Sequence, residues 1–334
     1  MPPLLTVEDL HTEFRTGAGI VRAVDGISYA VEQGETVAIV GESGSGKSVG
    51  ALSILRLIPD PPGRITRGAV RFLGRDLMQL SDEQMREVRG GDIGMVFQEP
   101  MTSLNPVLTI GRQITETLEQ HRRADRAAAH RRAVELLGLV GIADPLRRLK
   151  QYPHQLSGGM RQRVMIAIAL ACDPKLIIAD EPTTALDVTI QAQILELMNG
   201  LTRRLNVALV IITHNLGVVA RYAKRVNVMY AGRIVESGPA GAIYHDPRHP
   251  YTIALLRSVP RLDRPRRARL DPVDGQPPDL TRLDQGCAFR ARCRFAVDAC
   301  AQTRPPLAPV SGTVGHLSAC LRSHEIAAAS GAVA

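Results

Sequence analysis

Residues 41–48 read GESGSGKS and match the pattern G-x-x-x-x-G-K-[ST]. They follow ETVAIV at 35–40, which predicts a buried strand, and precede the periodic apolar stretch 49–57, which predicts a helix. Glycines let the main chain wrap closely around phosphate oxygens, and N–H groups at a helix start supply positive potential. Lys47 can reach the β- and γ-phosphates of a nucleotide, and the Ser48 hydroxyl can bind Mg²⁺. The predicted phosphate site comprises Gly41, Glu42, Ser43, Gly44, Ser45, Gly46, Lys47 and Ser48.

A second apolar stretch, LIIADE at 176–181, ends in two carboxylates. Ligands bind at the carboxyl ends of strands in parallel sheets, so both acids are predicted to lie at the ligand edge. Asp180 is the expected Mg²⁺ partner, through water. Glu181 is the expected general base that polarises the attacking water.

Strands and helices alternate along most of the chain, which predicts an α/β fold with a largely parallel sheet. Further strands are expected at 5–14, 21–31, 93–98 and 207–212, with a hairpin at 226–236. The basic, Ala- and Leu-rich stretch 110–149 is expected to be helical, as is 164–171.

Composition narrows the class of protein. The 334 residues are 45% hydrophobic and 22% charged, which excludes a mainly disordered or fibrous chain. The longest uncharged run near the centre, 164–172, is shorter than the roughly 20 apolar residues of a membrane span. The N-terminus lacks the features of a signal peptide, so the cytoplasm is the expected compartment. The formal charge of +8 is compatible with a solvated basic surface, an anionic ligand, an acidic membrane face or nucleic acid.

The segment LSGGMRQR at 156–163 closely resembles the signature motif of ABC ATPases. The resemblance implies an ABC-type P-loop ATPase fold, with a mixed sheet core, a helical subdomain and a small C-terminal Cys-containing module. It also implies that two ATPase subunits sandwich two ATP molecules. The signature residues that would close over the partner's ATP are Ser157, Gly158, Gly159 and Met160.

Other positions are placed by the same resemblance. Gln98 resembles the Q-loop residue, which would help hold Mg²⁺ and sense the membrane partner, and Asp187 resembles the D-loop residue. His214 resembles the switch histidine near the γ-phosphate. Phe14 lies where such proteins carry an aromatic that stacks on adenine, with a buried strand aromatic as the alternative.

Two further stretches resemble the peptide/nickel-type importer group: QEPMTSLNP at 98–106, and HPYT at 249–252 followed by 255–260. The chain therefore resembles the ATP-binding subunit of an oligopeptide/dipeptide ABC importer. This implies ATP hydrolysis at the cytoplasmic face of the inner membrane, powering solute import. The implied partners are a second homologous ATPase in a heterodimer, two membrane permeases and an extracytoplasmic solute-binding protein, without nucleic acid. The alternatives are a nickel or glycoside importer, or a soluble ABC-type ATPase acting on nucleic acid.

The domain organisation follows from these assignments. Residues 1–98 and 164–256 are expected to form the ATPase core, with a RecA-like part and an antiparallel β part, and 99–163 the helical signature subdomain. A Pro- and Arg-rich stretch begins near residue 257, which is typical of a linker. The C-terminal module is expected over 257–325 and a tail over 326–334, in which the small-residue stretch 327–334 is expected to be disordered.

Five cysteines divide into two groups. Cys172 lies in an apolar helix and is expected to be a buried thiol. The others, Cys287, Cys293, Cys300 and Cys320, have the spacing C-x5-C-x6-C-x19-C. Four thiolates suit a [4Fe–4S] cluster or Zn²⁺, although the two closely spaced cysteine pairs (C-x2–4-C) that are usual in zinc sites are missing. Similar modules in this importer group are associated with a [4Fe–4S] cluster, which is the prediction; zinc or no metal are the alternatives. Arg290, Arg292 and Arg294 would offset cluster charge or simply lie on the surface.

Overall fold

The computed structural model describes residues 2–184, 186–219, 221–258, 273–283, 285–310 and 312–330. These residues belong to two compact units. The first unit comprises Met1–Leu4, Val31–Thr36 and Gln79–Ile212, and the second comprises Leu5–Ala30, Val37–Met78 and Thr213–Ala334. These units do not coincide with the predicted domain boundaries, which stay a prediction.

The second unit contains an antiparallel four-stranded sheet. Its order is β2 (Gly19–Val31), β1 (Leu5–Thr16), β4 (Gly63–Phe72) and β5 (Arg75–Asp76). Strand β1 pairs with β4 from Leu5 opposite Phe72 to Phe14 opposite Gly63. The alternation of buried residues shifts by one between Val7 and Leu10, where a register shift follows Glu8.

A second set of strands in this unit positions the phosphate loop. Its order is β11 (Ala308–Pro309), β12 (Leu317–Ser318), β10 (Arg233–Pro239), β9 (Arg225–Tyr230) and β3 (Thr36–Val40). Strand β3 is buried throughout and runs parallel to β9, so its carboxyl end leads directly into the loop before α1 (Lys47–Ile54). The predicted hairpin of β9 and β10 is confirmed, with positive φ at both Ala231 and Gly232.

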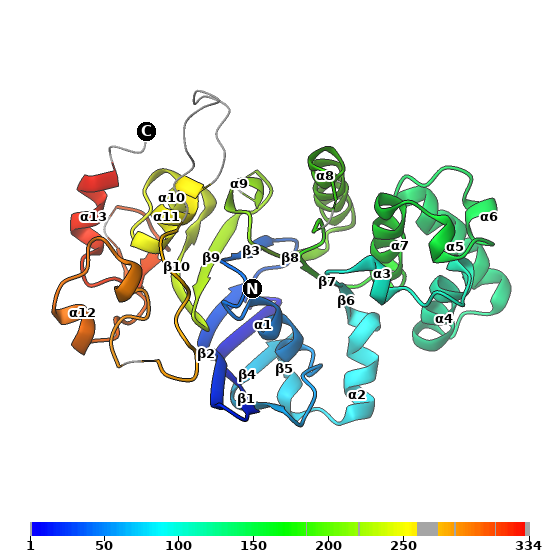
Figure 1. Ribbon diagram of the computed structural model, residues 1–334. Helices are drawn as coiled ribbons and strands as arrows, with labels where there is room; N and C mark the ends of the chain where they lie inside the picture. The colour runs from blue at the N-terminus through cyan, green and yellow to red at the C-terminus, as the bar shows by residue number, and fades with distance from the viewer. Residues whose placement is uncertain are drawn as a thin grey trace. The chain divides into compact units, whose positions relative to one another are not determined.

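The remaining elements of the second unit are short (Figure 1). They are α9 (Leu216–Val219), α10 (Ala240–His245), α11 (Pro250–Ser258), the 3₁₀ turn η4 (Arg290–Arg292), α12 (Ala299–Gln302) and α13 (Ser323–Ser330). Helix α13 includes the first residues of the predicted tail, and the tail itself stays a prediction. Most of the predicted linker, residues 259–272, and residues 331–334 lie outside the described residues.

The first unit holds three parallel strands, in the order β8 (Ala208–Thr213), β7 (Leu176–Asp180) and β6 (Ile93–Val96). All positions of β7 and β8 are buried, as their continuous apolar sequences predict. Register pairs Ile93 with Leu176 and Leu176 with Ala208. The carboxyl ends of β6 and β7 therefore bring the residues after Val96 and Asp180 to the same edge.

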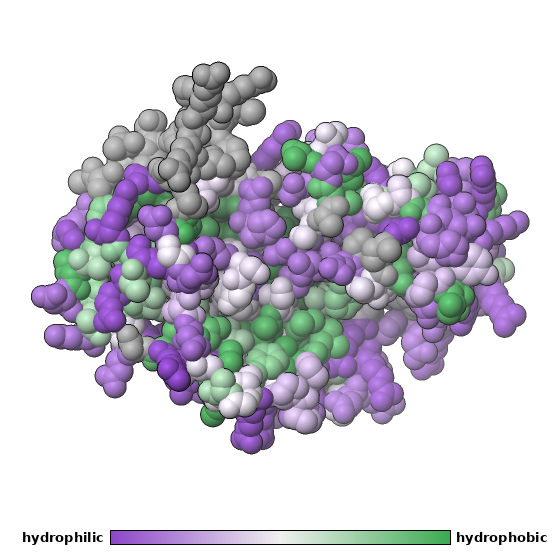
Figure 2. Space-filling view, viewed as in Figure 1, coloured by the Kyte–Doolittle hydropathy of each residue, from purple (hydrophilic) through white to green (hydrophobic). Residues whose placement is uncertain are grey.

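Helices form the rest of the first unit. Before β6 in the chain come η1 (Leu77–Gln79), of which only Gln79 belongs to this unit, α2 (Asp82–Glu87) and the π-helical turn η2 (Val88–Asp92). After β6 comes α3 (Pro100–Ser103). Next come α4 (Ile110–Arg122), α5 (Arg126–Leu139), α6 (Pro145–Arg148), the turn η3 (Pro153–Gln155), α7 (Gly158–Leu170) and α8 (Val188–Leu205). Helices α4 to α7 gather in one group (Figure 1), and the exposed side of this group is largely hydrophilic (Figure 2). Among the described residues, no helix combines the length and apolarity needed to span a membrane.

Candidate functional site

The phosphate loop connects β3 to α1 in the second unit, and its glycines are held against neighbouring main chain. A Cβ at Gly41 would lie 2.2 Å from the carbonyl oxygen of Met229. Gly46 has a φ of +98°, and its Cβ would lie 2.1 Å from the carbonyl oxygen of Ala23. Only glycine fits either position without main-chain movement, which explains the glycines at both ends of the loop.

The lysine of the loop is buried and directed at the loop itself. Lys47 is 4% exposed, and its Nζ donates hydrogen bonds of 2.8 Å to the carbonyl oxygens of Gly41 and Glu42. Ser43 and Gly44 form the exposed tip, and Ser48 lies in the first turn of α1. A buried ammonium beside a glycine-rich loop and a helix N-terminus has the chemistry of a polyphosphate site.

The two carboxylates end β7 in the first unit, as predicted. Asp180 is 6% exposed, and the N–H of Glu181 donates to Ile212 at 2.9 Å. Glu181 has a φ of +43°, in the left-handed region that non-glycine residues rarely adopt. Such a conformation costs about 1–3 kcal/mol and is typical of functional positions.

Two side chains of the same unit donate hydrogen bonds to the Glu181 carboxylate. Gln98, which follows β6, donates from Nε2 to Oε2 at 3.3 Å, and Thr184 donates from Oγ1 to the same oxygen at 2.7 Å. The structure therefore brings together two predicted site residues from neighbouring strands. Thr184 was not predicted; its only sequence signal is a hydroxyl three residues after the second acid.

The predicted signature and D-loop residues begin helices of the first unit. The Ser157 side chain caps α7 and accepts from the Met160 N–H at 3.3 Å. Asp187 likewise caps α8 and accepts from the Ile190 N–H at 2.9 Å. A Cβ at Gly159 would lie 3.1 Å from Ile190, so the two segments are close. Ser157 and Asp187 are both exposed, so the start of α7 can meet an anion, and the start of α8, already capped by a carboxylate, can meet a partner.

The predicted adenine and switch residues lie in the second unit. Phe14 is half-buried in β1, and a Cβ at Gly63 on β4 would lie 2.7 Å from its ring. This contact agrees with the alternative of a strand aromatic, and stacking on adenine stays a prediction. His214 is exposed and directly follows β8, and its place near a γ-phosphate stays a prediction.

The four C-terminal cysteines line one small pocket in the second unit. All four are free thiols, and His249 and Phe289 line the same pocket. Burial raises the pKa of Cys287 and Cys293 above the usual range and that of Cys320 to about 11. These three thiols are therefore protonated at neutral pH. Cys172 is fully buried, as predicted.

The prediction of a metal in this module is not confirmed. In the part of the chain that the structure describes, no three His, Cys, Asp or Glu side chains form a group that could hold a metal ion. The four thiols therefore line one pocket, but they are not arranged as the ligands of a single metal ion.

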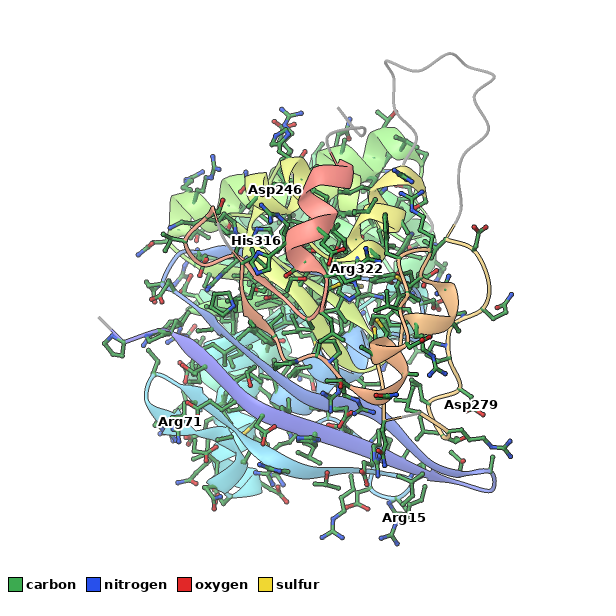
Figure 3. All side chains as sticks on the ribbon, turned by 90° about the vertical axis from the view of Figure 1, so that its left-hand side faces the viewer. Arg15, Arg71, Asp246, Asp279, His316 and Arg322 are labelled. Atoms are coloured by element: carbon green, nitrogen blue, oxygen red, sulfur yellow. The ribbon has the colours of Figure 1, made fainter. Side chains whose placement is uncertain are left out.

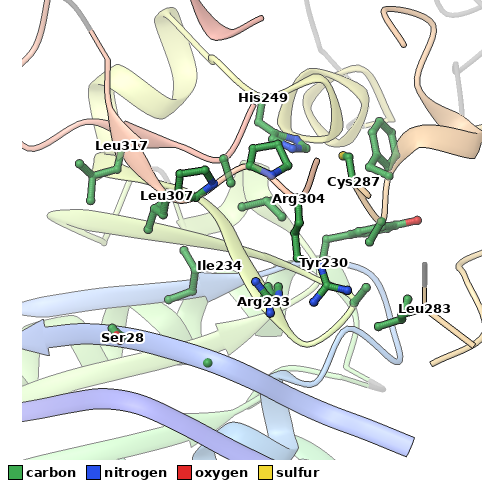
Figure 4. A pocket seen from close by; sticks show the side chains of 18 residues that line it. Ser28, Tyr230, Arg233, Ile234, His249, Leu283, Cys287, Arg304, Leu307 and Leu317 are labelled. Atoms are coloured by element: carbon green, nitrogen blue, oxygen red, sulfur yellow. The ribbon is translucent and has the colours of Figure 1, made fainter. Parts of the chain in front are cut away.

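A larger cavity of about 420 Å³ lies beside the same module (Figure 4). Tyr230, His249 and Cys287 line it together with apolar side chains such as Leu307 and Leu317. Burial lowers the pKa of His249 from 6.5 to about 3, so this imidazole is neutral. Residues of strands β9 and β10 and residues of the cysteine module both line this cavity.

Comparisons with known proteins agree with this geometry. Residues 24–184 match the model of the ABC transporter family, and residues 235–300 match that of the oligopeptide/dipeptide transporter C-terminal region. The oligopeptide transport ATP-binding protein OppD of Bacillus subtilis (strain 168) is 54% identical over 93% of this chain and 87% of its own length. A putative peptide import ATP-binding protein of Brucella abortus (strain 2308) is 55% identical over 98% of this chain and 99% of its own.

A solved structure gives the same result for the fold. A dimeric ATP-binding cassette in a post-hydrolysis state, bound to ADP and phosphate, superimposes with a TM-score of 0.63 at 29% identity. The match covers 71% of this chain and 98% of that one. The chain belongs to the ABC transporter family, in the group of ATP-binding subunits of oligopeptide and dipeptide importers.

Proposed function

We propose that the residues described above hydrolyse ATP and that this hydrolysis powers peptide import, the activity after which the relatives are named. The observation that carries the proposal is the oriented carboxylate of Glu181. It follows the strand-end acid Asp180, and Gln98 and Thr184 donate to it. A carboxylate fixed in this way can accept a proton from water and direct its oxygen toward a phosphorus atom.

Each further group has a role in the same reaction. Lys47 and the N–H groups of the loop bind the phosphates, so the negative charge that develops on the γ-phosphate is stabilised. Ser48, Asp180 and Gln98 are oxygen donors of the kind that Mg²⁺ prefers, and they would hold this ion, which neutralises phosphate charge when bound. Glu181 takes a proton from the attacking water as the water oxygen bonds to the γ-phosphorus and the bond between that phosphorus and the leaving oxygen of ADP breaks. His214 is proposed to contact the γ-phosphate, and Phe14 the adenine.

The exposed helix starts are proposed to meet a second ATPase subunit. The segment Ser157–Met160 offers main-chain N–H groups at the start of α7, suited to the phosphates of a nucleotide held by the partner. Asp187 would contact the same partner. We propose a heterodimer of ATPases at the cytoplasmic face of the inner membrane, with two permeases and a solute-binding protein.

Glu181→Gln tests the role of the base. The amide cannot accept the proton of water, while the phosphate loop is unaltered. We expect ATP turnover to fall by about 100-fold or more, with ATP binding retained. The measurement is steady-state phosphate release beside equilibrium binding of ATP with Mg²⁺. Hydrolysis at the parental rate would show that another group is the base.

We further propose that the four-cysteine module binds a [4Fe–4S] cluster. The support is the set of possible ligands: four free thiols line one pocket, and no described Asp or Glu side chain lines it with them. Thiolates are the ligands of such clusters, and a cluster spaces them more widely than a single ion does. Binding would require the raised pKa values to be overcome by release of thiol protons.

Purification without oxygen tests this second proposal. We expect about four irons per chain and a broad visible absorption typical of a cubane cluster, both lost in Cys293→Ser. Cys172→Ser, outside the module, is the matched control and should retain the iron. One zinc per chain, or no metal in the anaerobic protein, would refute the cluster and leave the ATPase proposal unaffected.

A further inference from the structure

Glu42, the second residue of the phosphate loop, is bound by Arg292 of the cysteine module, the C-terminal segment that carries Cys287, Cys293, Cys300 and Cys320. Both oxygens of its carboxylate accept hydrogen bonds from the guanidinium of Arg292, at 2.7 Å to Oε2 and 2.9 Å to Oε1. Arg292 directly precedes Cys293 in the sequence. Two segments that are 250 residues apart are therefore joined by a bidentate ion pair, the strongest geometry for such a pair.

The Arg292 side chain is fixed on every side. Only 4% of it is exposed, against 26% for Glu42. Its remaining N–H groups donate to the Tyr230 hydroxyl at 3.4 Å and to the carbonyl oxygens of Val273 and Asp274 at 3.0 and 2.7 Å. All five guanidinium donors are thus used. The guanidinium carbon also lies 5.8 and 5.9 Å from the ring centroids of Tyr230 and Phe289.

The main chain of Glu42 is held from the same side. Its N–H donates to the hydroxyl of Tyr251 at 2.7 Å. Tyr251 lies in α11, is fully buried, and packs against Tyr230 and Phe289 with centroid distances of 4.6 and 5.4 Å. The tyrosine of the HPYT stretch and the arginine of the cysteine module therefore hold one residue of the loop through a shared aromatic cluster.

The charge of Glu42 makes this contact consequential. A carboxylate in a loop that receives phosphates repels them, and the repulsion grows where solvent is partly excluded. A bidentate arginine cancels the charge and turns the carboxylate toward the module. Removing the arginine alone would leave a partly buried negative charge without its partner, which is costlier than removing both.

The geometry points to Arg292 as a positioning residue for the nucleotide site, which sets the charge and the conformation of the phosphate loop through Glu42. This inference rests on the proposed function of the loop as the ATP phosphate site. The cysteine module would thereby contribute to ATP affinity without touching the nucleotide. Binding of nucleotide and the integrity of the module are then linked in both directions.

Arg292→Gln tests the inference in the full chain by equilibrium binding of ATP, ADP and adenosine. We expect ATP to bind about tenfold more weakly, ADP to lose less and adenosine to be unchanged, because the unpaired charge acts on phosphates. The loss should shrink at high salt. Arg292→Lys, which keeps the charge without the fork, should restore part of the affinity. Arg294→Gln is the matched control, an exposed arginine of the same module that stacks on Phe295.

A double-mutant cycle separates the ion pair from a general structural effect. In a Glu42→Gln background, Arg292→Gln should change ATP affinity by less than about threefold. A tenfold loss that persists in this background, or an equal loss of ATP and adenosine, would show that Arg292 acts on folding and would overturn the inference. Unchanged ATP affinity in Arg292→Gln would overturn it too. Wild-type protein that binds no ATP would instead refute the proposed function.

Discussion

The space around Gly46 leaves no room for a side chain, whereas Gly44 in the same loop has none of its neighbours within 4 Å of a Cβ. Both have positive φ, of +98° and +79°. We expect Gly44→Ala to lower the free energy of unfolding by about 1–2 kcal/mol, the cost of the left-handed conformation. Gly46→Ala should cost more than about 3 kcal/mol, because its Cβ would meet the Ala23 carbonyl as well. Denaturant unfolding of both variants measures the difference.

Each alanine variant serves as the control for the other, because both substitutions lie in the same loop and both place alanine at a positive φ. Equal losses would mean that the loop relaxes away from Ala23 at little cost. The close packing of Gly46 would then be no constraint on the conformation of the loop.

Residues with local sequence patterns could be predicted, and those that act through distant contacts could not. The phosphate-loop pattern and the acids at the end of β7 could be recognised because a few consecutive residues carry the chemistry. Thr184 and Arg292 have no such pattern, and their roles depend on the folded positions of Glu181 and Glu42. The sequence suggested only that Arg292 lies on the surface or offsets cluster charge.

At the scale of elements, hydrophobic periodicity predicted the strands well. Strands β1, β2, β3, β7, β8 and the β9–β10 hairpin are present at the expected places. Strand β4 was missed because residues 64–68 contain a single apolar side chain, Ile65, and are mostly exposed. The stretch 110–149 is not one helix, since Thr109 and Asp125 each cap a new one.

A buried acid in β10 shows why the C-terminal elements could not be predicted. Glu236 is fully buried and accepts from the N–H groups of Arg248 and His249 at 2.6 and 3.0 Å. It also bonds His316, itself fully buried, at 2.8 Å. The ion pair of Arg71 and Glu8 on the antiparallel sheet, unlike that of Glu236 and His316, is exposed to solvent. Figure 3 labels His316 and Arg71. Charged side chains usually lie on the surface, so the sequence contains no sign that Glu236 joins the residues just before α11 to the residue just before β12.

At the scale of the whole molecule, the structure groups the C-terminal module with the phosphate loop. The second unit contains both, together with the antiparallel sheet. The sequence suggested a separate module after a linker, because Pro- and Arg-rich residues precede it. The contacts of Arg292 and Tyr251 with Glu42 provide a physical reason for the grouping.

The assembly of two ATPases can be tested with Glu181→Gln, which should retain ATP. We expect this chain alone to keep its 36.2 kDa mass in MgATP, and to form a one-to-one complex with the second ATPase of the same transporter. The reason is the exposed start of α7, whose N–H groups suit the phosphates of a nucleotide bound by the partner. Ser157→Arg in this chain should weaken the complex about 100-fold, because a bulky side chain blocks that helix start. Light scattering coupled to size exclusion measures both masses. A stable dimer of this chain alone would contradict the heterodimer, and an unaffected Ser157→Arg complex would exclude the signature segment from the interface.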